Sequence, residues 1–332
     1  MRLARPLALA TWGILTLVAA APARGQEHDL IIRNGRVLDG TGNPWYYADV
    51  AVSGGRITAI GDLKGARARR TIDVKGLYVA PGFIDVHTHA GGGLATRELS
   101  HAQPLLAQGI TTAVVNPDGG GAVDLVKQQS ELRAARPAVN VAQMVPHGSV
   151  RGAVIGMEDR APTPAEMERM KGMVRAGMQA GAFGLSSGPY YAPGSYAKTE
   201  ELVELSRIAS AYGGVYSSHI RDEADYNIGV VAAVDEVIRV AREADLPGIV
   251  THIKALGPRV WGYSEALVKR IERAREEGVE VFADQYPYEA SGTGITGALV
   301  PRWAQVGGDT ALVRRINTPG ERARLREGIV EN

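Results

Sequence analysis

Two histidines in alternate positions give the first sign of chemistry in this chain. They close the segment Phe83-Ile84-Asp85-Val86-His87-Thr88-His89. Residues two apart in a β-strand face the same side, so the imidazoles of His87 and His89 would point together. Such a pair can supply adjacent ligands to a metal ion, although a lone His-x-His is more often hydrogen-bonded within a core.

Further polar residues follow a series of short apolar runs. The runs span residues 82–86, 111–115, 139–145, 182–185, 215–217, 248–250 and 279–283. The residues that follow the second to seventh runs include Asp118, His147, Ser186-Ser187, His219, His252 with Lys254, and Asp284. Helical start signals lie between the runs, at Thr163-Pro164-Ala165-Glu166, Thr199 and Ser264. Alternating strands and helices predict βαβ units and a parallel sheet.

The placement of these polar residues favours a barrel over an open, doubly wound sheet. In a barrel, chemistry gathers at the carboxyl ends of many strands, whereas an open sheet binds at one switch point. We therefore predict an α/β fold with an incomplete TIM-type (β/α) barrel of about seven strands. Four histidines should share its rim with a carboxylate and hold one or two metal ions. These histidines are His87, His89, His219 and His252.

The residues before the first run predict a separate small β domain. Asn34-Gly35 and Ser53-Gly54-Gly55 each lie between short apolar runs, as hairpin turns do. We expect residues 27–80 to form a small antiparallel sheet, part of a sandwich, and residues 81–332 to form the barrel.

Several segments, in order, carry a family resemblance. They are Ala80-Pro81-Gly82-Phe83-Ile84-Asp85-Val86-His87-Thr88-His89, Gly109-Ile110-Thr111-Thr112, Gly184-Leu185-Ser186-Ser187-Gly188-Pro189-Tyr190-Tyr191, Ser218-His219-Ile220-Arg221-Asp222-Glu223, Thr251-His252-Ile253-Lys254 and Asp284-Gln285-Tyr286-Pro287-Tyr288. Over about residues 28–300 the chain resembles the amidohydrolase superfamily and, within it, the N-acyl-D-amino-acid deacylase (D-aminoacylase) family.

The resemblance implies roles for named residues. His219 and His252 match the histidines that hold a tightly bound zinc ion, and His87 and His89 match the pair of a second, weaker metal position. Asp118 stands where the family usually has a cysteine ligand; it would be a carboxylate ligand, or else only cap a turn. The matching substrate-binding residues are Lys254 and Tyr286, for the carboxylate and amide region, and Tyr190 and Tyr191, for the acyl pocket.

Three other polar residues keep open alternatives. His147 could form structural hydrogen bonds or take part in catalysis. Asp85 is predicted to orient the neighbouring histidine rather than to bind a metal. Arg221 could meet a substrate carboxylate, or pair with the adjacent Asp222 or Glu223.

The implied activity is hydrolysis of the amide bond of N-acyl-D-amino acids by a zinc-activated water. The family's proton-carrying Asp follows an eighth strand, which the sequence after Tyr288 does not predict, so we expect a C-terminally truncated chain with doubtful activity. No lysine ends the fourth strand, so a carboxylated-lysine site is not expected. The alternatives are a cyclic-amide hydrolase of the dihydroorotase or hydantoinase kind and a non-catalytic exported binding protein or inactive fragment.

The composition and the N-terminal residues limit the remaining classes of partner and cellular location. A net charge of +1 in 332 residues, without a basic block, argues against a nucleic-acid partner. Arg2 and Arg5, an apolar run over residues 7–20 and Ala21-Pro22-Ala23 predict a signal peptide over residues 1–25. We expect a periplasmic or extracellular enzyme for a small-molecule substrate, with no stable membrane span after cleavage.

Overall fold

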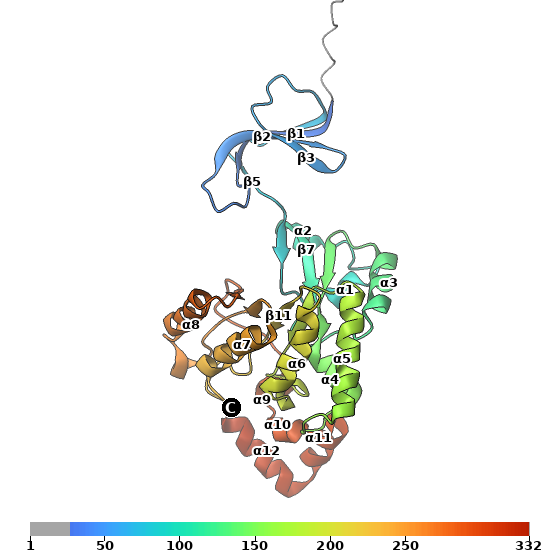
Figure 1. Cartoon of the computed structure of the whole chain (residues 1–332), viewed down its shortest axis with the longest axis vertical. Coiled ribbons are helices and arrows are strands. Elements are labelled where there is room, and N and C mark those ends of the chain that lie inside the picture. The colour runs from blue at the N-terminus through green and yellow to red at the C-terminus, as the bar shows by residue number, and fades with distance from the viewer. Residues whose placement is uncertain (1–26, 332) are drawn as a thin grey trace, which may run out of the picture. The chain divides into compact units, whose positions relative to one another are not determined.

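The computed structural model describes residues 27–331 (Figure 1), which divide into two compact units between Pro81 and Gly82. The predicted signal peptide, residues 1–25, lies outside the described residues and stays a prediction. None of the helices between residues 27 and 331 combines the length and the apolar character that crossing a membrane needs.

The first unit is a single sheet built around β1 (His28–Val37). β1 pairs with β2 (Tyr46–Ser53), and β2 pairs with β3 (Arg56–Gly61). Both pairings are antiparallel, as predicted, and the turn between β2 and β3 uses the positive φ angles of Gly54 and Gly55. β4 (Ala68–Asp73) and β5 (Tyr78–Val79) join β1 in parallel, so the complete sheet is mixed.

The predicted hairpin at Asn34-Gly35 is wrong. β1 runs through both residues, and its register to β2 shifts between Ile32 and Gly35, which marks a β-bulge. Asn34 has a φ of 61°, and its N–H donates to Asp49 Oδ1 at 2.9 Å. This bulge uses the left-handed backbone that a tight hairpin turn also uses, so the dipeptide alone does not distinguish the two.

The second unit contains seven parallel strands in chain order, counting β8 and β9 as one, which confirms the predicted α/β barrel fold. They are β6 (Phe83–Asp85), β7 (Ile110–Val115), β8 (Asn140–Gln143) with β9 (Val145–Pro146), β10 (Gly184–Ser187), β11 (Val215–Ser218), β12 (Gly248–Val250) and β13 (Val281–Ala283). Met144 interrupts the third strand, so β8 pairs with β7 whereas β9 pairs with β10. Because all pairings are parallel, the carboxyl ends of the strands share one side of the sheet.

Helices follow most of these strands and cover the sheet (Figure 1). The longer ones are α3 (Leu125–Ala135), α4 (His147–Ile155), α5 (Pro164–Gln179), α6 (Thr199–Ser210), α7 (Val230–Ala244) and α8 (Ser264–Glu276). From α4 to α8 each contacts the next, and Leu185, Tyr216 and Val250 of the strands are buried beneath them in one apolar core. After β13 come α9 (Ile295–Leu299), α10 (Arg302–Gln305), α11 (Gly308–Asn317) and α12 (Pro319–Glu331).

Only one of the three predicted helix caps is confirmed. Thr163 and Glu166 form the reciprocal capping box of α5. The hydroxyl of Thr199 instead donates to Glu236 Oε1 at 2.7 Å, because a carboxylate is the stronger acceptor, and the cap of α6 is Lys198. Ser264 is the first residue of α8 rather than its cap.

Candidate metal centre

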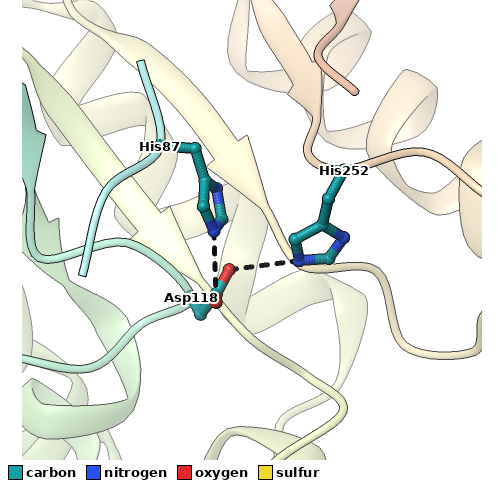
Figure 2. A group of neighbouring side chains, drawn as sticks. All are labelled: His87, Asp118 and His252. Carbon is teal, nitrogen blue, oxygen red and sulfur yellow. Dashed lines mark ion pairs between the residues drawn. The ribbon is translucent and has the colours of Figure 1, made fainter. Parts of the chain in front are cut away.

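The predicted metal ligands come together from the carboxyl ends of four strands. His87 and His89 follow β6, Asp118 follows β7, His219 follows β11 and His252 follows β12. Figure 2 shows His87 and His252 pointing toward the Asp118 carboxylate from separate elements. The predicted gathering of distant side chains at the strand ends is therefore present.

Asp118 lies at the centre of this group. Its Oδ2 is 3.3 Å from His87 Nε2 and 3.1 Å from His89 Nε2. Its Oδ1 is 3.6 Å from His252 Nε2 and 3.9 Å from His219 Nδ1. The carboxylate therefore faces one histidine pair with each oxygen, as a bridging ligand between two ions would.

The four histidines are not equivalent. His219 Nδ1 and His252 Nε2 are 2.8 Å apart, and both side chains are buried. His87 is half-buried, whereas the His89 side chain is 71% exposed. Atoms of His87, Asp118 and His252 lie close enough to share one ion, and so do atoms of His219, Glu223 and His252, whereas His89 belongs to neither group.

The loop that carries Asp118 is held in an uncommon backbone conformation. Asn116 and Asp118 have φ angles of 63° and 55°, in the left-handed region that costs a non-glycine residue about 1–2 kcal/mol. Ser186 at the end of β10 secures both sides of this loop. Its Oγ donates to the Asn116 carbonyl at 2.6 Å and accepts the Gly119 N–H at 3.3 Å. The neighbouring strand thus fixes where the carboxylate points.

Burial and charge shift the pKa values of the site in opposite directions. Burial works to raise the pKa of Asp118, but contacts with His252, His87 and His89 hold it well below its usual range. Burial lowers the pKa of His219 to about 4. Burial also opposes the charged form of His252, yet the Asp118 and Glu223 carboxylates raise the pKa of this imidazole to about 9. Asp118 is therefore ionised, as a carboxylate ligand of a cation must be.

A cavity of about 1260 Å³ opens above these side chains. All four predicted substrate-binding residues line it, namely Lys254, Tyr286, Tyr190 and Tyr191. The rings of Tyr190 and Tyr191 lie 5.0 and 4.7 Å from the His219 ring. The buried hydroxyl of Tyr286 has no hydrogen-bond partner within the described part of the chain. It is available to a molecule in the cavity.

The open alternatives for three other residues resolve as follows. His147 is fully buried and lies 2.8 Å from Glu201 Oε1 through its Nε2, a contact inside the fold. Asp85 accepts the backbone N–H of His87 at 3.0 Å. Arg221 pairs with Glu236 at 2.8 Å, so the expectation that it pairs with Asp222 or Glu223 is wrong. Glu236 lies on helix α7, fifteen positions along the chain, while Asp222 and Glu223 bind other partners.

Two further carboxylates reach the site without having been assigned a role there from the sequence: Asp284 was noted only as a strand-exit residue, and Glu223 only as a possible partner of Arg221. Glu223 Oε1 lies 3.0 Å from His252 Nδ1 and in short contact with Lys254 Nζ. Asp284 Oδ1 accepts the His252 N–H at 2.7 Å, and its Oδ2 has no hydrogen-bond partner among residues 27–331. Asp284 stands at a strand exit, which was a usable signal. Glu223 lies in a loop beside another acid, which was not.

The donor set fits a divalent cation such as zinc. His219 Nδ1, His252 Nε2 and Asp118 Oδ1 face one another, and this carboxylate oxygen is buried without a hydrogen-bond partner in the described chain. Imidazole nitrogens and a carboxylate oxygen are ordinary zinc ligands. An ion at their centre would satisfy all three.

Comparisons with known proteins identify the family of the chain. A profile described as the amidohydrolase family matches residues 70–315. The chain is 38% identical over 291 residues to the D-aminoacylase of Alcaligenes xylosoxydans xylosoxydans, covering 81% of this chain and 59% of that protein. It is 39% identical over 290 residues to the N-acyl-D-glutamate deacylase of the same organism, covering 81% and 58%.

Solved structures give the same result. The N-acyl-D-glutamate deacylase of Bordetella bronchiseptica, complexed with zinc and a phosphonate inhibitor that mimics the tetrahedral intermediate, superposes with a TM-score of 0.73 at 40% identity, covering 79% of this chain and 59% of that one. A D-aminoacylase with a binuclear metal centre also gives 0.73, at 37% identity and the same coverage. The chain spans about 59% of the length of these relatives. Since the family profile covers most of its residues, the chain belongs to the amidohydrolase family.

Proposed function

We propose that this protein hydrolyses the amide bond of N-acyl-D-amino acids in a zinc-dependent reaction. The observation that carries the proposal is the meeting of Asp118 with His87, His219 and His252 at the strand ends, on the floor of a cavity. Relatives named D-aminoacylase, N-acyl-D-glutamate deacylase and N-acyl-D-aspartate deacylase, each 36–39% identical to this chain, support the substrate class.

We assign the tighter zinc position to His219, His252 and Asp118, and a weaker one to His87, His89 and the other oxygen of Asp118. The burial of the first group and the exposure of His89 support this order. Zinc, when bound, polarises an amide carbonyl and lowers the pKa of water to about 7. Asp118 and the histidines would hold the ion, and two of these histidines, His219 and His252, are buried.

The cavity residues would position the substrate. The hydroxyl of Tyr286 would donate to the amide oxygen as negative charge develops on it. The Lys254 ammonium, 5.5 Å from the centre of the Tyr286 ring, would meet the substrate carboxylate on the same side. Tyr190 and Tyr191, with ring centres 4.9 Å apart, would cover the acyl group.

The test is hydrolysis by the purified full-length protein loaded with zinc, offered matched N-acetyl-D- and N-acetyl-L-glutamate. We expect release of the free D-amino acid in preference to the L-form. His252→Asn should abolish both zinc binding and hydrolysis, whereas His101→Asn, at an exposed histidine outside the cluster, should change neither. A zinc-loaded full-length protein that cleaves no N-acyl-amino acid of either hand would contradict the proposal.

We also propose that the protein is exported. The charged start, apolar run and small-residue site over residues 1–25 support export. Mass spectrometry of the protein from its native cell would find a mature N-terminus near Ala23. An intact Met1 on the periplasmic or extracellular protein would contradict cleavage.

A further inference from the structure

Glu223 lies at the Nδ1 edge of the His252 ring, whereas Asp118 lies at the Nε2 edge. Glu223 follows His219 by four residues, in the loop between β11 and α7, and is 5% exposed. Its Oε1 lies 3.0 Å from His252 Nδ1 and 4.0 Å from His219 Nε2. The same oxygen is in short contact with Lys254 Nζ. One carboxylate thus touches a metal ligand and a substrate-binding residue.

The loop around Glu223 is anchored on both sides. Asp222 accepts the backbone N–H groups of Ala224, Asn227 and Gly229 at 2.9, 2.6 and 2.9 Å. The Glu223 carbonyl accepts the N–H of Leu256, on the loop after β12, at 2.8 Å. The backbone that carries Glu223 is therefore held in place beside His252.

The two nitrogens of His252 face different partners. Nε2 faces Asp118 and His219, where the ion would lie, whereas Nδ1 faces Glu223. An ionised carboxylate only accepts hydrogen bonds, so Glu223 favours a hydrogen on Nδ1 and a free electron pair on Nε2. Lys254 Nζ also lies 2.9 Å from Nδ1 and can only donate, which would favour the opposite arrangement. Glu223 itself binds the Lys254 ammonium, and this contact limits donation from Lys254 to His252 Nδ1.

We infer that Glu223 is a positioning residue: it orients the His252 ring so that Nε2 faces the ion, and it ties that ligand to Lys254. This inference rests on the proposed function for the identity of the ion. Loss of such a partner of a metal-binding histidine typically weakens metal affinity by 10- to 100-fold.

The experiment measures the affinity of the purified chain for zinc alone, by competition with a chromophoric chelator. We expect Glu223→Gln to weaken binding by about 10- to 100-fold. Glu236→Gln is the matched control, because Glu236 is a similarly buried carboxylate (side chain 8% exposed, against 6% for Glu223) that pairs with Arg221 instead. Its affinity for zinc should stay within about threefold of the wild type.

Two further variants separate position from charge. Glu223→Asp keeps the charge but withdraws the carboxylate by one methylene, so it should also weaken zinc binding. Lys254→Met removes the competing ammonium and should leave zinc binding intact or tighter. The visible spectrum of the cobalt-substituted protein, which reports ligand geometry, should change in Glu223→Gln and not in Glu236→Gln.

Wild-type affinity in Glu223→Gln or Glu223→Asp, or a loss in Lys254→Met as large as in Glu223→Gln, would overturn the inference. These results leave the proposed function standing. Conversely, a protein that binds zinc through Glu223-dependent geometry but hydrolyses no N-acyl-amino acid would contradict the proposed function and keep the role of Glu223.

Discussion

Gly119 offers a direct test of how the Asp118 loop is built. It follows Asp118, is buried and has a φ of +70°. A Cβ at this position would lie 2.9 Å from Gly188 N, 3.1 Å from Gly148 N and 3.2 Å from the Ser187 carbonyl carbon. All three are backbone atoms at the exits of neighbouring strands, so none can turn aside as a flexible side chain would.

The cost of Gly119→Ala follows from these two features. The left-handed backbone costs a residue with a Cβ about 1–2 kcal/mol. An extra methyl in a closely packed place costs about 1–3 kcal/mol more. We therefore expect the free energy of unfolding to fall by about 2–5 kcal/mol, a large part of the roughly 5–15 kcal/mol typical of a folded protein. Relief of the clash would move Asp118, so zinc content should fall as well.

Gly120→Ala is the matched control next in the chain. Its Cβ would meet only the Pro117 carbonyl oxygen at 3.9 Å, and its φ lies outside the left-handed region. Urea titration followed by circular dichroism gives the two free energies of unfolding, and metal analysis gives zinc per chain. If both variants unfold within about 0.5 kcal/mol of each other and keep equal zinc, the steric argument is refuted.

Three other predictions can be checked on the same preparation. Thr163→Ala should lower the free energy of unfolding by about 1 kcal/mol through loss of the α5 cap, and an unchanged urea midpoint would contradict it. Burial works to raise the pKa of Glu201, but contacts with His147 and Arg151 hold it below its usual value. The stability that Glu201 contributes is therefore complete above its unfolded pKa of about 4.3 and lost as the pH falls through its folded value. The stability difference between wild type and Glu201→Gln, about 3–5 kcal/mol near neutral pH, should shrink in acid, and a constant difference would refute the assignment. Removal of zinc by a chelator should lower the melting temperature, and zinc at 100 times its Kd should restore about 2.7 kcal/mol; identical melting with and without zinc would contradict binding to the folded state.

The sequence was sufficient for the order of the strands and for the meeting of the ligands. Parallel βαβ units bring strand ends to one rim regardless of their separation in the chain, so His87 and His252 could be placed together without knowing any distance. The same logic placed Asp118, although not the way in which Ser186 and Gly119 shape its loop.

Contacts that depend on loop conformation and on how helices cross could not be predicted from the sequence. Nothing local distinguishes Glu223 from Asp222, yet one faces His252 and the other turns back to cap its own loop. Arg221 pairs with an acid on α7 rather than with either neighbour. The Asn34-Gly35 dipeptide is compatible with a bulge and with a hairpin turn, and only the pairing of β1 with β2 distinguishes the two.

The interruption at Met144 gives the metal centre a second consequence. His87 and Asp118 follow strands on one side of this seam, and His219 and His252 follow strands on the other. An ion held by both groups would link strands on the two sides of this interruption, in addition to the backbone hydrogen bonds from Met144 N–H to the Val115 carbonyl (3.1 Å) and from Phe183 N–H to the Gln143 carbonyl (2.9 Å). Loss of the ion would weaken the contact between the two groups of strands. Amide hydrogen exchange near Met144 should therefore become faster in the zinc-free protein, by a larger factor than exchange in the core under α6 and α7.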